Sequence, residues 1–457
     1  MTSPSLCSST SFSRFSKVVV ALLAYGTITT VTYASSVVPR DRTVDARAVR
    51  SVVSAYFAQR AAALETMAVP DFASITSADQ SGRDTAAIET ARLTVLVEQE
   101  RATGTTYTRY RAAIEVESLD LDAAAGTASV EISETDSAQT NVSPDIEAKS
   151  LSHHLVTLRK TQGAWKVTAD NYRDEIKDYI ATSGKSVAEI IDDLHRQVAE
   201  RETARKDALG AAGVSDESTN AQVNALFQAG YSKAEIERTV IAPLAEKLQR
   251  TGAAVSAQRL NVTPLARIYH PLNAANAVAY AHRWAYHVRN PAFADFKANI
   301  GLGGDCTNFV SQVILAGGAP MERTGNWVWF YDAMNPPPGY PGAKRSASWS
   351  GVNDLYSFLT TNPPTLGPVG RTTSLYSLLP GDIVQLQNDP GNRWGHSAVV
   401  VSATWKPIWY WSWWPVGWQM TWTYEVLIAC HEDDKDNFNL NGWSMWPQRY
   451  LTISYYN

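Results

Sequence analysis

The spacing of hydrophobic and polar positions divides the chain into an N-terminal and a C-terminal part with different patterns. Between residues 44 and 64, apolar side chains recur at helical spacing and form one broad face. Runs that alternate with a period of two then predict strands at residues 106–121, 127–135, 152–160 and 164–169. A long helix followed by hairpins indicates a small α+β domain over residues 41–176.

Residues 177–262 have a different pattern, in which most side chains are polar and the spacing of the apolar ones is typical of helices. Glu, Arg, Asp and Ala dominate residues 186–209, and the run Ser232-Lys233-Ala234-Glu235 is a capping box for a further helix. Pro243 lies inside that helix, where it predicts a kink or a boundary because proline lacks the N–H that the helix needs. We expect a helical connector in this region.

The C-terminal part, residues 263–457, combines one strong helix with apolar strands. The helix begins near residue 305, carries apolar residues at helical spacing and ends at Gly317-Gly318. Strands are expected at residues 382–386, 396–401 and 424–430. The pattern predicts an α+β domain with a helix packed on a sheet, so the whole chain falls in the α+β class.

Composition narrows the range of partners. The chain has 457 residues and a net charge of −5. It shows no basic patch, no zinc-type cysteine spacing and no phosphate-binding loop, so nucleic acid is not an expected partner. The acidic run after His431 departs from the calcium loop of an EF-hand because Phe438 occupies a ligand position. We expect no metal and no cofactor, and the sequence leaves the oligomeric state open.

Residues 1–34 indicate whether the protein is exported from the cytoplasm. Arg14 and Lys17 precede an apolar run that is shorter than a membrane-spanning helix, and Ala34 ends a stretch suited to signal cleavage. Residues 1–34 are therefore expected to be a signal peptide, and the mature protein to be secreted or otherwise extracytoplasmic, without a stable membrane span. Cleavage removes Cys7 and leaves Cys306 and Cys430, for which a disulfide and two independent thiols are both open.

The most informative motif surrounds Cys306. Glycines at 303 and 304 precede it, and a helix follows it. The N-terminus of a helix presents unpaired N–H groups and the positive end of the macrodipole, both of which stabilise a thiolate. Because the thiolate is the reactive form of cysteine, Cys306 is a candidate nucleophile. A buried structural thiol is the alternative.

Two histidines provide candidate partners for this thiol. His396 opens an apolar strand, and His431 ends the next such strand. A cysteine at a helix start, a histidine on a strand and a third polar group that orients the imidazole are the parts of a cysteine hydrolase. The third group is expected to be His431, with Asp433 or Asp436 as alternatives.

The motifs of the last two-fifths of the chain resemble a known family. The matching pieces are Ala279-Tyr280-Ala281, Trp284-Ala285, Asn290-Pro291, Phe296, the run from Gly304 to Gln312, Gly317-Gly318, Gly381-Asp382, His396-Ser397 and His431. They are similar to the bacterial putative amidase domain family, a papain-like branch of cysteine hydrolases related to the CHAP and NlpC-type cell-wall peptidases. The resemblance implies a papain-like fold and an amide-bond hydrolase with Cys306 as nucleophile, His396 as base and His431 as third member. Residues 41–176 loosely resemble the cone-shaped NTF2-like fold.

A tryptophan-rich stretch, longer than in that family, lies between the two histidines. Pro415 and Gly417 predict a turn at its middle, which is expected to place Trp413 and Trp414 beside the strand ends that carry the histidines. The candidate substrate-binding residues are Trp394, Trp413, Trp414, Asn308 and Asp305. Burial in a core hairpin is the alternative for the tryptophans, and helix capping is the alternative for Asp305.

These observations favour a secreted cysteine amidase or peptidase that acts on a cell-wall peptide or a similar peptidoglycan-like amide. Two alternatives stay open: a catalytically silent surface protein that binds glycans through its tryptophans, and a thiol-dependent acyl transferase. The N-terminal domain contains no cysteine after cleavage and no recognisable histidine constellation. It is therefore expected to carry no catalytic residue and to serve placement or stability.

Overall fold

The computed structural model describes residues 44–260, 269–296, 304–324, 327–332, 344–361, 367–389, 391, 393–413, 416–432 and 434–456. The expected signal peptide at residues 1–34 lies outside these residues. Within the described part of the chain, no helix is both long enough and apolar enough to cross a bilayer.

Helices account for most of the connector and for one layer of the C-terminal part. They are α1 (Val44–Thr66), α2 (Gln80–Thr103), α3 (Glu175–Thr182), α4 (Val187–Ala211), α5 (Asp216–Gln228), α6 (Lys233–Ile236), α7 (Ala242–Leu260), α8 (Ala274–Trp284), α9 (Asp305–Ala316), α10 (Ala347–Ser350) and α11 (Val352–Thr361). Shorter helical turns are η1 (Phe72–Ser74), η2 (Glu237–Ile241), η3 (Leu375–Ser377) and η4 (Leu440–Trp443).

The strands, like the helices, follow the two-part pattern of the sequence. They are β1 (Tyr107–Asp122), β2 (Thr127–Thr140), β3 (Ala148–Thr161), β4 (Ala164–Asn171), β5 (Tyr269–Pro271), β6 (Tyr331–Asp332), β7 (Lys344–Arg345), β8 (Gly367–Thr373), β9 (Ile383–Leu386), β10 (His396–Trp413), β11 (Val416–Cys430), β12 (Lys435–Asn439) and β13 (Gln448–Tyr456). The α1 helix and strands β1 to β4 confirm the elements predicted for the N-terminal part.

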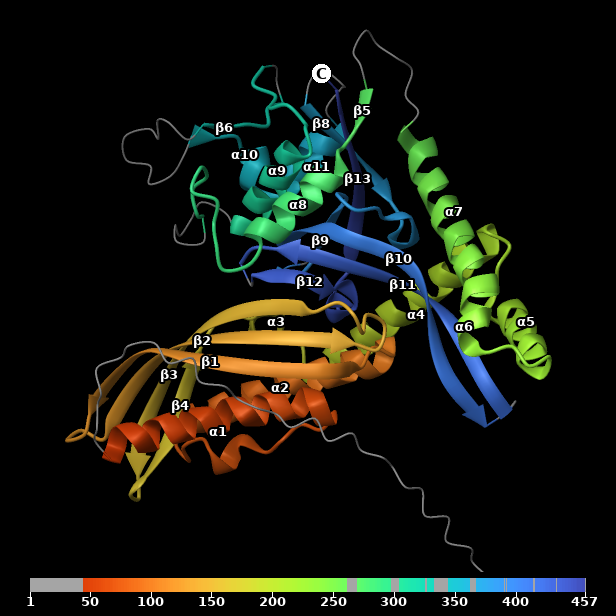
Figure 1. Cartoon of the computed structure of the whole chain (residues 1–457). Coiled ribbons are helices and arrows are strands. Elements are labelled where there is room, and N and C mark those ends of the chain that lie inside the picture. Colours follow the sequence, from red (N-terminus) through yellow and green to blue (C-terminus); the bar gives the residue numbers. More distant parts are fainter. Residues whose placement is uncertain are drawn as a thin grey trace, which may run out of the picture.

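Among the described residues, one antiparallel sheet of 11 strands runs through both parts of the chain. Its order is β1-β2-β3-β12-β11-β10-β9-β13-β5, with β4 beside β3 and β8 beside β13. The junction is the short β3–β12 pair, in which Lys435 lies opposite Ser150 and Asp436 opposite Lys149. Figure 1 shows the N-terminal strands (orange and yellow) meeting the C-terminal strands (blue) beside α3. The combination of helices with a large antiparallel sheet is consistent with the predicted α+β class.

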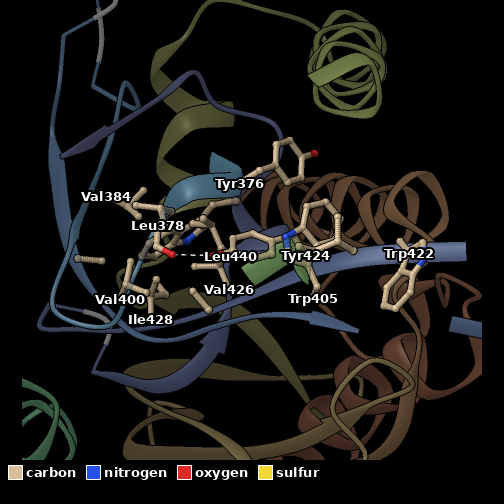
Figure 2. Packing of buried hydrophobic residues seen from close by; sticks show 14 of the residues in the cluster. Tyr376, Leu378, Val384, Val400, Trp405, Trp422, Tyr424, Val426, Ile428 and Leu440 are labelled. Atoms are coloured by element: carbon tan, nitrogen blue, oxygen red, sulfur yellow. Dashed lines mark hydrogen bonds between the residues drawn. The ribbon is translucent and has the colours of Figure 1, made fainter. Parts of the chain in front are cut away.

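The first part of β10 is buried on both faces of the sheet. Neighbouring residues on a strand point to opposite sides, so its alternate residues enter two different cores. Val399 and Val401 face a core formed with α8, α9 and α11. Ala398 and Val400 face a second core, to which α4, α5 and α7 contribute. Figure 2 shows this second core, where the Tyr424 hydroxyl donates to the Leu378 carbonyl over 2.6 Å. The connector helices thus form one of the two layers that cover the sheet.

Two of the connector helices begin where the sequence predicts. The capping box at Ser232 and Glu235 is present at the start of α6, and a second one at Ser186 and Glu189 starts α4. The interruption expected at Pro243 takes the form of the π-helical turn η2, which ends just before α7. A proline cannot donate to the helical ladder, so the irregular turn accommodates the missing hydrogen bond.

A third core lies between α1 and strands β1 to β4. At its edge Arg60 is buried against three carboxylates, Glu89 at 3.4 Å, Glu134 at 3.4 Å and Asp170 at 3.3 Å. His154 joins this cluster through Asp170 at 2.9 Å, whereas its neighbour His153 is exposed on the other face of β3.

Candidate active site

Cys306 occupies the second position of α9 and is 1% exposed. The first N–H groups of a helix have no intrahelical acceptor, so the backbone around Cys306 presents donors and the positive end of the helix dipole. The sulfur lies 3.8 Å from the Thr307 hydroxyl, which hydrogen-bonds Ser397 of β10 over 3.0 Å. This link fixes the start of α9 against the start of β10.

His396 is the first residue of β10, where it pairs with Leu386 of β9. The Cys306 sulfur, a ring nitrogen of His396 and a carboxylate oxygen of Glu432 all lie within 4.8 Å of one another. The imidazole is 2% exposed and makes an edge contact with Trp443 at 5.1 Å between ring centroids. The structure therefore brings together the thiol and the histidine that the motifs indicated.

Two carboxylates flank the His396 ring. Glu432 places Oε2 3.6 Å from Nδ1, and Glu175 places Oε1 3.5 Å from Nε2. The other oxygen of Glu175 accepts the Trp443 indole N–H over 2.7 Å. Glu175 is the first residue of α3, so the region expected to serve placement or stability contributes a side chain that contacts the imidazole. Neither Glu175 nor Glu432 is expected at the site from the sequence pattern.

Glu432 has a second role, because its Oε1 accepts the Asp305 N–H over 3.0 Å and so caps α9. The backbone of Glu432 has a φ of 86°, a conformation that non-glycine residues rarely adopt. A Cβ on Gly304 would lie 2.0 Å from Glu432 Oε1, so glycine is needed there for the carboxylate to approach. One carboxylate thus joins the start of the cysteine helix to the histidine.

The charges around His396 favour its protonated form. Burial lowers the pKa of His396, but the Glu175 carboxylate and the Cys306 thiol outweigh burial and raise the pKa well above its ordinary value. The Nε2 atom is buried without a well-aligned hydrogen bond. A cationic imidazole beside a thiol favours the thiolate, which is the nucleophilic form.

Cys430 also lies against His396, at the end of β11. Both cysteines are free thiols in this structure. Burial raises the pKa of the Cys430 thiol, although His396 and Lys435 work in the opposite direction. A thiol with a raised pKa is a poor nucleophile at neutral pH, so burial disfavours Cys430 as the nucleophile.

Both ring nitrogens of His431 form hydrogen bonds with groups other than His396. Its Nδ1 bonds Asp305 over 2.6 Å, its Nε2 bonds the Trp284 carbonyl over 2.8 Å, and the ring stacks on Phe309. With both nitrogens engaged, His431 is not placed to orient the His396 imidazole and instead ties the end of α8 to the start of α9. Of the alternatives, Asp436 bonds His282 over 2.7 Å, and Asp433 lies outside the described residues.

Asp305 and Asn308 are buried in a network inside the domain. Asp305 Oδ1 accepts the Phe296 N–H over 3.1 Å and the Asn308 amide over 2.7 Å. Asn308 Oδ1 accepts the Trp349 indole N–H over 2.7 Å. These bonds give both side chains a role in holding the start of α9. Helix capping, the alternative role for Asp305, falls to Glu432.

The tryptophan candidates lie in three different situations. Trp394 is half-buried beneath the Arg449 guanidinium at 4.2 Å, and Trp414 lies outside the described residues. Trp413 is 82% exposed at the end of the 18-residue strand that begins with His396. Such a strand is roughly 55 Å long, so the expectation that the turn lies beside the histidines was wrong. The pairing continues to Trp413 and Val416, which carries the turn away from the site.

An open cleft of about 760 Å³ reaches His396 from solvent. Its walls come from both parts of the chain: Arg173, Glu175 and Asp178 from the segment around α3, and Asn388, Asp389 and Glu432 from the C-terminal part. The site thus combines a buried thiol with an imidazole and two carboxylates that line the cleft. This set can support nucleophilic catalysis, and the same donor types can also bind a metal.

The fold and the site define an α+β protein with a cysteine–histidine–carboxylate centre. Residues 271–455 match the family model described as "Putative amidase domain", which is the family that the motifs indicated for the C-terminal part of the chain. The family suggests an amidase-type hydrolase.

A curated relative and a solved structure were also found. The uncharacterized protein YhbB of Bacillus subtilis (strain 168) is 32% identical over 129 residues, which are 28% of this chain and 36% of that protein. The chain thus spans little more than a third of that relative. The crystal structure of the intermembrane space region of the chloroplast protein ARC6 covers 28% of this chain and 97% of that chain at 20% identity, with a TM-score of 0.21. That score is too low to support a statement about the fold, and the NTF2-like resemblance has no support here.

Proposed function

We propose that this chain is an exported, cysteine-dependent amide hydrolase. The observation that carries the proposal is the grouping of Cys306, His396 and Glu432 within 4.8 Å at the start of α9. The match of residues 271–455 to the amidase family supports the reaction class. The leader-like residues 1–34 support export, and with it a peptide or peptidoglycan-like amide outside the membrane as substrate.

The proposed reaction proceeds through a thioester. The Cys306 thiolate attacks the amide carbonyl carbon, and the carbonyl electrons move to the oxygen, where the helix N–H groups stabilise the negative charge. The oxyanion then collapses, the C–N bond breaks, and the His396 imidazolium gives its proton to the leaving nitrogen, which departs as an amine. Neutral His396 next removes a proton from water, and the hydroxide formed attacks the thioester. Release of the carboxylic acid restores the thiolate and the imidazolium.

Glu175 and Glu432 are the proposed positioning residues for His396. Their carboxylates lie against opposite nitrogens of the ring and stabilise its positive charge. This assignment replaces His431 as the third member, since both nitrogens of His431 are engaged elsewhere.

A metal-dependent hydrolase is the second candidate, favoured by the fact that thiolate, imidazole and carboxylate are ligands of zinc sites. The two mechanisms respond differently to inhibitors. The thiol mechanism predicts that iodoacetamide abolishes hydrolysis and that 1,10-phenanthroline leaves it unchanged. Loss of activity with the chelator, restored by added zinc, would establish the metal mechanism instead.

The variant Glu175→Gln should shift the pH dependence of kcat/KM. The Glu175 carboxylate raises the pKa of His396, so its removal lets burial lower that pKa. Because the proposed reaction needs protonated His396 to donate to the leaving nitrogen, activity is lost as pH rises through this pKa. The alkaline limb of the profile should therefore move to lower pH, with a loss of at least about tenfold at pH 8.

The matched control is Glu217→Gln, because Glu217 is also in the first turn of a helix but is exposed. Its profile should coincide with that of the wild type. An alkaline limb that stays in place in Glu175→Gln would show that this carboxylate does not act on His396.

A further inference from the structure

A second cavity lies on the other side of Glu175, at the junction of the two parts of the chain. It holds about 1030 Å³ of empty space that continues to solvent. Its walls include Leu96 of α2, Tyr107 of β1, and Phe438 and Trp443 of the β12–η4 segment. It forms where the β3–β12 pair joins the two parts of the sheet.

This cavity adjoins the candidate active site. Arg173 and Glu175 line both the cavity and the cleft that reaches His396. The Glu175 carboxylate lies between the two spaces, since Oε1 faces His396 at 3.5 Å and Oε2 accepts the Trp443 indole N–H over 2.7 Å. The Glu175 carboxylate is therefore the group that lies between a molecule in the cavity and the His396 imidazole.

Two acidic groups of the cavity wall form no salt bridge among the described residues, whereas each basic group of the wall is paired with another carboxylate: Arg92, Lys149, Arg173 and Lys435. Glu100 is 5% exposed, and its Oε2 has no hydrogen-bond partner. Asp136 Oδ1 is also buried without a hydrogen-bond partner, while Oδ2 accepts a hydrogen bond from the Ser150 hydroxyl over 3.3 Å. The nearby Arg92 is paired with Asp174 at 2.8 Å.

The protonation of these two groups is poised near neutral pH. Burial raises the pKa of Glu100 to about 8, against a hydrogen bond from Tyr107 that lowers it. Burial and repulsion from Glu134 raise the pKa of Asp136 to about 7. A hydrogen bond with Tyr110 and the positive charges of Arg60 and Arg92 lower this pKa, but by less. A cation that enters the cavity would stabilise the ionised forms and displace protons.

We propose that this cavity is a binding site for a primary alkylammonium group of the substrate, received by Glu100 and Asp136, with its methylene groups against Leu96, Phe438 and Trp443. The orphaned carboxyl oxygens supply acceptors for an ammonium group, and the apolar wall suits a short aliphatic chain. The assignment of the ligand as part of the substrate rests on the proposed amide hydrolysis, whereas the site itself does not.

Isothermal titration of the full chain with n-hexylamine and with 1-hexanol tests the site. The amine should bind at least tenfold more tightly than the alcohol, because only the amine brings a positive charge. At pH 7 its binding should release protons, which is measured by comparing heats in buffers of different ionisation enthalpy. Glu100→Gln should weaken amine binding at least tenfold and remove most of the proton release.

The exposed Glu117 of β1 provides the matched control, since Glu117→Gln should bind the amine like the wild type. If Glu100→Gln fails to fold, Asp136→Asn is measured in its place, with the same weakening expected. Absent amine binding, equal binding of amine and alcohol, or unchanged binding in these variants would overturn the proposal.

Hydrolysis is measured separately so that the two proposals can fail independently. Amine binding with no effect of Cys306→Ala on hydrolysis would contradict the thiol mechanism alone. Loss of hydrolysis in Cys306→Ala without amine binding would contradict the ammonium site alone.

Discussion

Cys306→Ala should reduce kcat for amide hydrolysis by ~10³-fold or more while the protein stays folded, the scale expected when a nucleophile is removed from a unit that acts together. The alanine side chain fills the place of the buried thiol closely and leaves the Asp305–Glu432 cap intact. Turnover of a chromogenic amide and the thermal unfolding curve measure the two effects.

Cys430→Ala is the matched control, because Cys430 is the other buried thiol beside His396. It should cost much less than tenfold in kcat, since burial raises its pKa and it does not lie at a helix start. Equal losses for the two variants would indicate a joint role, such as metal binding, and would contradict the assignment of Cys306 alone.

A fragment that begins at residue 261 should not fold. It retains the region matched to the amidase family but lacks α4, α5 and α7, which cover one face of β10 and β11. Ile190, Leu194 and Leu248 are among the buried side chains it loses. Burial of each aliphatic side chain stabilises the folded protein by about 1.5–3 kcal/mol. The loss of several such side chains is comparable to the whole free energy of unfolding of a typical protein, about 5–15 kcal/mol.

Circular dichroism and thermal unfolding test this fragment. A chain that begins at residue 44 keeps every described contact and serves as the folded control. A fragment from residue 261 that unfolds cooperatively and still contains a reactive Cys306 would show that the two parts are energetically independent.

Local features of the site could be predicted from the sequence. The helix start at Cys306 and the strand start at His396 follow from a few neighbouring residues, as do the capping boxes of the connector. The α2 helix was missed because Gln80–Thr103 begins with polar residues and a glycine and has no strong apolar stripe. Its start depends on the Asp79 side chain, which caps the Gly82 N–H over 2.9 Å.

The parts of the site that depend on long-range packing could not be predicted. Glu175 lies far from His396 in the sequence, and the two meet because the start of α3 lies against the start of β10 and Trp443 of η4. Glu432 could have been considered, since it follows His431 directly at the end of an apolar strand. Its positive φ turns the carboxylate toward α9, a feature that a sequence pattern does not indicate. The sequence favours His431 instead, because this histidine ends the next apolar strand and the family resemblance extends to it.

Peptide mapping by mass spectrometry after reaction with iodoacetamide tests the central claim most directly. At pH 7 and limiting reagent, Cys306 should be carbamidomethylated well before Cys430. The fraction of hydrolytic activity that is lost should equal the fraction of Cys306 that is modified. Preferential modification of Cys430, or full hydrolysis by protein whose Cys306 is completely modified, would contradict this claim.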